Sequence, residues 1–169
     1  MKPLVFNSTP LIYLGKAGVL QHLKEIKGEK LTSLCVFEEV VVKGKEKSAE
    51  EAFVIEKLIE EKVIDVRAPK KEFLKPLERV PKIHKADAEV LALADELDGI
   101  AIVDDDKARK IGNLMGIENR GSIYILFRFF DCSVLDKEGL KKTFDEMVRL
   151  GWRCSTELYA AVLEEIERL

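Results

Sequence analysis

The chain has 169 residues, of which 47% are hydrophobic and 35% are charged, a length and composition that fit one globular domain with a substantial core. Its 28 basic and 31 acidic residues give a net charge of -3, which excludes a strongly basic nucleic-acid binder. No stretch reaches the roughly 18 apolar residues that a bilayer-spanning helix requires, and no secretory apolar region opens the chain.

Cysteine usage points to a reducing compartment. Cys35, Cys132 and Cys154 are an odd, widely spaced set that contains no CxxC pair. We therefore expect reduced, mostly buried thiols rather than a disulfide framework or a zinc site. Together with the missing membrane and secretory signals, this predicts a cytoplasmic protein without membrane contact.

Short apolar runs alternate with amphipathic segments along the chain. The predicted elements, in order, are a strand at 4–6, a helix from about 9 that breaks between 15 and 18, an amphipathic segment at 19–26, a strand at 30–32, a helix at 34–42, a loop at 43–47, a helix at 48–59, a strand at 63–66, an irregular stretch at 69–81, a helix at 86–94, a strand at 100–103, a helix at 107–115, and helices at 121–130, 137–150 and 155–169. This alternation predicts an α/β fold whose mostly parallel sheet of four or five strands is covered on both faces.

Polar residues mark the predicted helix starts. Ser8 or Thr9 is placed to cap the first helix, and Ser33 is placed to cap the helix after the second strand. Ser48 and Glu51 have the spacing of a capping box. No linker or internal repeat interrupts the pattern, so we expect a single domain over residues 1–169 with a helical extension from about residue 136.

Three consecutive aspartates, Asp104, Asp105 and Asp106, lie where the buried strand at 100–103 ends and a helix begins. Open α/β sheets bind ligands beyond the carboxyl ends of their strands. The simpler alternative is that Asp104 or Asp105 caps the helix and Asp105 pairs with Arg109, a pair that contributes only about 0.2–0.5 kcal/mol. A cap needs one acid, so we favour a site in which a divalent cation offsets the repulsion.

Two further acidic positions lie on predicted helices. Asp87 shares a helix face with Val90 and Leu91, which directs it toward the interior or a cleft. Its alternative is an acid in a first turn that the helix dipole favours. Either Glu38 or Glu39 faces inward in the same way, and spacing does not separate the two. Their alternative is a solvated pair on a helix rim.

The first strand also ends in a polar side chain, Asn7, which is either a turn or cap residue or part of the same site. Four segments in this order resemble a PIN domain, and the resemblance spans nearly the whole chain. They are VFNSTPLI at 5–12, VFEEV at 36–40, ADAEVLALA at 86–94 and VDDDKAR at 103–109, and Gly121-Ser122 with the stretch at 150–155 resembles the tail of a prokaryotic, VapC-related subfamily.

The resemblance implies a three-layer α/β/α sandwich with a central parallel sheet and an acidic pocket for Mg²⁺ or Mn²⁺. PIN-domain proteins are typically ribonucleases of single-stranded RNA, many are toxins that an antitoxin protein neutralises, and they commonly form homodimers. The expected function is therefore metal-dependent hydrolysis of RNA phosphodiester bonds. The alternative is a catalytically weakened PIN-fold scaffold that binds RNA or protein.

The resemblance also assigns residues to roles. It implies Asp87, Asp104 and Asp105 as metal ligands, with Glu39 as a direct or water-mediated ligand. The family has an acid where this chain has Asn7, whose amide offers an oxygen but no charge, so metal affinity should fall.

Secondary roles fall to residues beside the acids. Ser8 or Thr9 is expected to bind a phosphate or a metal-bound water, and Arg109 to neutralise the RNA backbone unless it is simply a solvated helix charge.

Other constellations carry less weight. His22 and His84 are isolated and far apart, so they support neither a zinc site nor a catalytic triad. The aromatic residues at 124–130 fit a core or a dimer seam better than base stacking. No GxGxxG or GxxxxGK[ST] loop supports nucleotide binding, and no hydroxyl follows the three aspartates as an aspartyl-phosphate chemistry would require.

Overall fold

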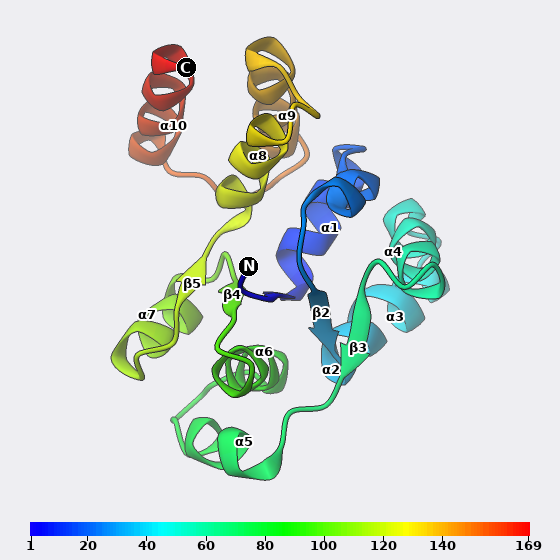
Figure 1. Ribbon diagram of the computed structural model, residues 1–169, viewed down its shortest axis with the longest axis vertical. Helices are drawn as coiled ribbons and strands as arrows, with labels where there is room; N and C mark the ends of the chain where they lie inside the picture. Colours follow the sequence, from blue (N-terminus) through cyan, green and yellow to red (C-terminus); the bar gives the residue numbers. More distant parts are fainter.

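A computed structural model describes residues 1–169 and places five strands in one sheet at the centre of the molecule (Figure 1). Every neighbouring pair is parallel, and the strand order is β3-β2-β1-β4-β5. The strands are β1 (Leu4–Phe6), β2 (Lys30–Ser33), β3 (Asp65–Arg67), β4 (Ile100–Ile102) and β5 (Asn119–Arg120). The predicted α/β class and parallel sheet are confirmed.

Twelve helical segments connect and cover the strands. They are α1 (Ser8–Lys16), the 3₁₀ helix η1 (Leu20–Glu25), α2 (Leu34–Phe37), the π-helical turn η2 (Glu38–Val42), α3 (Lys43–Glu46), α4 (Glu50–Glu60), α5 (Lys71–Glu78), α6 (Lys85–Glu96), α7 (Asp106–Leu114), α8 (Ser122–Asp131), α9 (Lys137–Arg149) and α10 (Thr156–Arg168). None of these helices is both long enough and apolar enough to cross a lipid bilayer.

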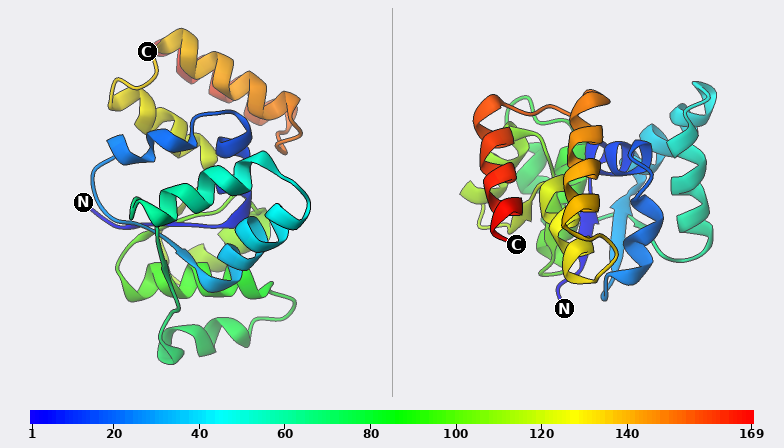
Figure 2. Two further views of the ribbon diagram at one scale, coloured as in Figure 1. Left: turned by 90° about the vertical axis from the view of Figure 1, so that its right-hand side faces the viewer. Right: turned by 90° about the horizontal axis from the view of Figure 1, so that it is seen from above.

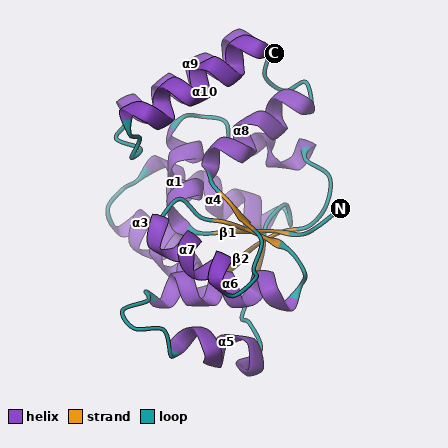
Figure 3. Cartoon of the chain, turned by 90° about the vertical axis from the view of Figure 1, so that its left-hand side faces the viewer, coloured by secondary structure: helices purple, strands orange, loops and turns teal.

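Helices lie on both sides of the sheet, as the views in Figures 1 and 3 show. α6 contacts β1, β2 and β4 on one face, with α5 packed outside it, whereas α1, α4 and α8 lie on the other side. The two central strands, β1 and β4, are buried along their whole length. Strands covered on both faces need continuous apolar runs, which the segments LVF and IAI provide.

The chain reverses its direction of travel across the sheet between β1 and β4. From β1 it proceeds to β2 and then β3 on one side, and from β4 it proceeds to β5 on the other. The backbone N–H of Asn7 donates to the carbonyl of Ile102 at 3.0 Å, so the carboxyl ends of these two strands lie side by side. Such a switch point leaves a crevice in which open α/β sheets bind their ligands.

Several local predictions were wrong for identifiable reasons. Residues 43–46 form the helix α3 rather than a loop, because Gly44 lets α3 approach α4 closely: a Cβ there would lie 2.9 Å from the Cβ of Ala52. Ser48 is not a cap but adopts a left-handed turn with φ 56° between the two helices, and α4 begins after Ala49.

Two other elements were not predicted from the periodicity of the apolar residues. The stretch predicted as irregular contains α5, which accommodates Pro76 because the residue is exposed and the carbonyl that loses its partner can bind water. The strand β5 has only two residues and both are polar, so it has no alternation of apolar and polar residues from which a strand could be predicted. The predicted Ser33 cap is confirmed: its Oγ accepts from the backbone N–H of Val36 at 3.2 Å.

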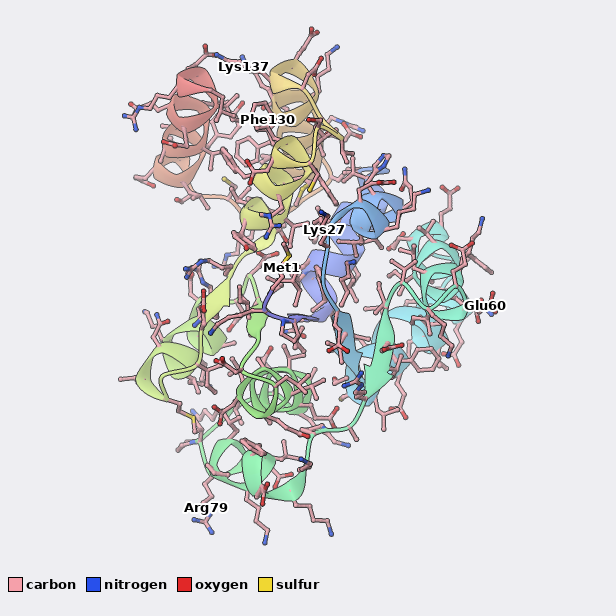
Figure 4. The ribbon with its side chains drawn as sticks, viewed as in Figure 1. Met1, Lys27, Glu60, Arg79, Phe130 and Lys137 are labelled. Carbon is pink, nitrogen blue, oxygen red and sulfur yellow. The ribbon has the colours of Figure 1, made fainter.

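The three cysteines are unpaired, as expected, although they are half-buried rather than mostly buried. Burial raises the pKa of the Cys35 and Cys154 thiols, which favours the thiol over the nucleophilic thiolate. The aromatic segment of α8 packs inward: Phe129 is fully buried, and Phe130 lies among the C-terminal helices (Figure 4). Phe129 thus fits the core interpretation, whereas the dimer-seam alternative for the half-buried Tyr124, Phe127 and Phe130 stays a prediction.

Candidate active and metal site

A cavity of about 300 Å³ opens at the carboxyl edge of the sheet, where β1 and β4 end. Its lining is almost entirely polar and comes from four separate stretches of the chain. The lining residues are Asn7, Ser8, Thr9, Glu39, His84, Ala86, Asp87, Asp104 and Asp105. The structure thus brings together all but one of the residues that the sequence assigned to the site.

Asn7 serves both as a helix cap and as part of the cavity. Its Oδ1 accepts from the backbone N–H of Ser8 at 2.9 Å, so Asn7, and not Ser8 or Thr9, is the cap of α1. Its Nδ2 donates to Oδ1 of Asp87 at 2.6 Å across the cavity. The two predicted interpretations of Asn7, cap and site residue, are therefore not exclusive.

Asp87 lies in the first turn of α6 with 8% of its surface exposed, the same fraction as Asn7. Burial raises the pKa of the Asp87 carboxyl above its ordinary value of 3.8. The hydrogen bond from Asn7 opposes that rise, whereas the nearby charges of Asp105 and Glu39 add to it. A cation in the cavity would relieve this cost of ionisation.

The structure separates the two glutamates that spacing could not. Both side chains are exposed, but Glu39 lines the cavity and its Oε2 accepts from Oγ of Ser8 at 2.8 Å, whereas Glu38 lies outside the lining. Both belong to η2, a π-helical turn inserted between α2 and α3. Such single turns are frequent at functional sites because they rotate the following side chains.

Asp104 and Asp105 are held in different ways. Asp104 accepts three hydrogen bonds: the backbone N–H of Ser122 at 2.7 Å, Oγ of Ser122 at 2.6 Å and Nε1 of Trp152 at 2.9 Å. Asp105 caps α7, since its Oδ1 accepts from the N–H of Ala108 at 2.9 Å. The capping alternative is thus correct for Asp105, which nevertheless lines the cavity.

The residues that follow along α7 lie outside the lining. Asp106 begins the helix and is exposed. Arg109, predicted to contact substrate, is exposed and directs its Nε to Oδ1 of Asn119 at 3.3 Å rather than pairing with Asp105. Contact of Arg109 with RNA stays a prediction.

Three residues near the site were missed. His84, dismissed as isolated, lines the cavity from the residue before α6, and its distance of three positions from Asp87 was the available signal. Ser122 and Trp152 hold Asp104 from 18 and 48 residues away. Both stood in segments that carried the family resemblance, but nothing in the sequence linked them to an aspartate.

The donor set suits a hard cation. Glu39, Asp87 and Asp105 each accept a hydrogen bond on only one carboxylate oxygen, so the second oxygen of each is free to bind a cation. No group of three or more His, Cys, Asp or Glu side chains is placed so that together they could hold a metal ion. Mg²⁺ keeps several waters and binds through one or two carboxylates, so such a group is not required.

Comparison with known proteins identifies the family. A family model described as a PIN domain, DUF3368, matches residues 3–168, so the chain belongs to the PIN-domain family. Among solved structures it is similar to VapC20 of Mycobacterium tuberculosis, described as a toxin that cleaves the sarcin-ricin loop. That similarity has 16% identity and a TM-score of 0.49 over 64% of this chain and 95% of that one. No curated protein sequence matches the chain.

Proposed function

We propose that this PIN-domain protein is an endoribonuclease that hydrolyses phosphodiester bonds of single-stranded RNA with the help of Mg²⁺ or Mn²⁺. The observation that carries the proposal is the convergence of Glu39, Asp87, Asp104 and Asp105, from four separate segments, on one cavity at the switch point of the sheet. Clustered carboxylates repel an RNA backbone, so RNA binding here depends on a cation that screens them.

When bound, the ion would polarise the scissile phosphate and activate a water for attack. Asp87 and Asp105 would hold the ion through their free carboxylate oxygens, and Asp104 and Glu39 would contact it directly or through its bound waters. Asn7 fixes the orientation of Asp87 through its donated hydrogen bond, and Ser8 does the same for Glu39.

The polar rim of the cavity supplies groups for the substrate. Thr9 and His84 line the cavity without a hydrogen bond from their side chains to the acids, so they are free to contact a phosphate. Arg109 lies outside the lining but on the side of Asp104, because a Cβ on Gly121 would lie 3.0 Å from Oδ1 of Asp104 and 3.9 Å from Nη1 of Arg109. We assign it to the RNA backbone that extends away from the cleaved bond.

The direct test is an RNA cleavage screen of the purified protein with Mg²⁺, with Mn²⁺ and with a chelator. Wild type should cut single-stranded RNA weakly and only with metal, and Asn7→Asp should cut faster because it adds a negative charge beside the cation. Asp87→Asn should remove the activity of both. If Asn7→Asp is inert on a broad panel of RNAs, the nuclease proposal is wrong.

A second candidate function is a noncatalytic PIN-fold scaffold that binds RNA or protein. Asn7 favours it, because an amide that donates to Asp87 partly satisfies the acid that a cation would otherwise bind. The scaffold would bind RNA with the same affinity in a chelator as in Mg²⁺, whereas the nuclease would not. Filter binding under both conditions separates the two functions.

The remaining assignments follow from the nuclease proposal. An antitoxin protein would be the physiological partner if a small antitoxin-like reading frame lies beside the gene, and light scattering would show whether the chain forms a homodimer. Residues 1–169 would act as one PIN domain with a helical extension from about residue 136. A cytoplasmic location suits the three unpaired cysteines.

A further inference from the structure

The helical extension reaches back to the acidic cavity through a single residue. Trp152 lies in the connection between α9 and α10, and only 5% of its surface is exposed. The left view of Figure 2 shows this connection on the side of the molecule opposite the N-terminus. The residues that line the cavity include Asn7, directly after β1. The indole Nε1 donates to Oδ2 of Asp104 at 2.9 Å.

The connection is fixed from both sides. Trp152 meets Phe144 of α9 edge to face, with ring centroids 6.3 Å apart, and Phe144 stacks on Tyr159 of α10 at 5.3 Å. The Tyr13 hydroxyl of α1 donates to the carbonyl of Gly151 at 3.1 Å. The indole therefore packs against α9, whose Phe144 is backed by α10, and the residue before it is tied to α1, while its N–H points to Asp104.

This contact limits how Asp104 can bind a cation. An ionised carboxylate offers about four acceptor positions. Two on Oδ2 are filled by Trp152 and the hydroxyl of Ser122, and one on Oδ1 is filled by the backbone N–H of Ser122. One acceptor position remains, on Oδ1, so Asp104 can act only as a monodentate ligand.

We infer that Trp152 and Ser122 are positioning residues: they lock Asp104 in the orientation that presents Oδ1 to the cation, so that the C-terminal extension completes the metal site. The inference rests on the proposed function, because it assigns Asp104 to a cation. Donors that orient a metal ligand from behind typically change metal affinity by about 10–100-fold when they are removed.

The test compares Mn²⁺ affinity, by titration calorimetry, in full-length Trp152→Phe, Ser122→Ala and Tyr159→Phe. Trp152→Phe keeps the ring against Phe144 but loses the donor, and Ser122→Ala loses one bond to Oδ2. Tyr159→Phe is the matched control, because it deletes a hydrogen bond of the same extension, to Asp145 at 2.7 Å, that does not reach Asp104. The first two should weaken Mn²⁺ binding about 10–100-fold, and the control should bind as wild type does.

A second readout needs neither metal nor activity. Trp152 is the only tryptophan, so its indole N–H gives one assignable NMR resonance. Without metal, Asp104→Ala should shift that resonance and speed its exchange with solvent, and in wild type Mg²⁺ should move it with saturation. The inference is overturned if Asp104→Ala leaves the resonance in place, or if Trp152→Phe and Ser122→Ala, folded in a chelator, bind Mn²⁺ as tightly as wild type.

These outcomes separate the two proposals. If wild type binds neither Mn²⁺ nor Mg²⁺ and cuts no RNA, the nuclease proposal fails, and the role of Trp152 in metal binding fails with it even where the indole contact is present. If wild type binds metal and the positioning variants match the Tyr159→Phe control, only the role of Trp152 and Ser122 is wrong.

Discussion

Asn7 lowers the electrostatic repulsion in the acidic cavity when no cation is bound. An acid at this position would place a fifth carboxylate beside Glu39, Asp87, Asp104 and Asp105, whereas the amide donates a hydrogen bond of 2.6 Å to Asp87. If the site holds a divalent ion as proposed, the same amide would weaken the attraction for that ion, because it contributes no charge. Under that proposal, Asn7 would lower metal affinity and raise the stability of the metal-free protein.

The raised pKa of Asp87 gives a pH prediction. Burial disfavours the ionised carboxylate in the folded protein, so the stability contribution of Asp87 is fully present below its ordinary pKa of 3.8 and is lost as pH rises through the raised value. Asp87→Asn removes the ionisation and can still accept from Asn7. In a chelator at pH 7 the melting temperature of Asp87→Asn should therefore be higher than that of wild type. Near pH 3.5 the two melting temperatures should be the same.

Thermal melts across that pH range measure the difference. Asp106→Asn serves as the control, because Asp106 is exposed outside the cavity and its charge should matter little. An Asp87→Asn protein that melts below wild type at pH 7 without metal would show that the carboxylate is not destabilising.

The sequence located most of the site because strand ends and helix faces are local features. Asp104 and Asp105 follow an apolar strand, and Asp87 lies on an apolar helix face, so both patterns could be predicted. The residues that donate hydrogen bonds to these acids could not be predicted. Trp152 approaches Asp104 from another part of the chain, and that proximity depends on the packing of α9 against α1 and of α10 against α9.

At the scale of elements, the segment from β2 to α3 decides which glutamate faces the cavity. Ser33 ends β2 and starts α2, and the π turn η2 then shifts the helical register before α3. The sequence predicted the cap and one continuous helix to Val42, but the side-chain spacing of a regular helix does not separate Glu38 from Glu39. The π turn contains one more residue than a regular helical turn, and this extra residue determines which glutamate faces the cavity. Nothing in the sequence indicates it.

The Ser33 cap should be measurable by itself. Ser33 is fully buried, and its Oγ holds the N–H of Val36 at 3.2 Å. Ser33→Ala should lower the free energy of unfolding by about 1 kcal/mol, within the usual range of about 0.5–2 kcal/mol for such caps. Urea denaturation measures the loss, and Ser155→Ala, at the exposed cap of α10, provides a comparison. No loss in Ser33→Ala would mean that the tertiary contacts alone position α2.

The same limits of local patterning apply to the rest of the fold. Apolar runs predicted β1 and β4, because central strands are buried on both faces, whereas β2, with the sequence KLTS, was predicted without such a run. β5 was missed, because two polar residues at a sheet edge carry no periodic signal, and they pair only because β4 lies beside them.

At the scale of the whole molecule, α8, α9 and α10 form a helical layer beyond the sheet, visible at the top of Figure 1. Phe144 lies at its centre, fully buried between Trp152 and Tyr159. The layer rests on α1 and holds Asp104 through Trp152. It is therefore part of the structure that shapes the cavity.

Phe144→Ala should test how strongly this layer is held. Truncating a fully buried phenylalanine typically costs about 3–5 kcal/mol, so urea denaturation should show a loss of that size. Leu158→Ala, on the exposed side of α10, should cost much less. A loss below about 1 kcal/mol for Phe144→Ala would show that the C-terminal helices pack independently of their aromatic centre.

The most direct measurement is the melting temperature of the purified protein in a chelator and at saturating Mg²⁺ or Mn²⁺. An ion at about 100 times its dissociation constant stabilises by about 2.7 kcal/mol, equivalent to about 5–10 °C for a chain of this size. Wild type and Asp106→Asn should show this gain, and Asp105→Asn should lose most of it while keeping its helix cap. A wild-type melting temperature that neither ion changes, or an equal gain in Asp105→Asn, would contradict a cation site at the carboxyl edge of the sheet.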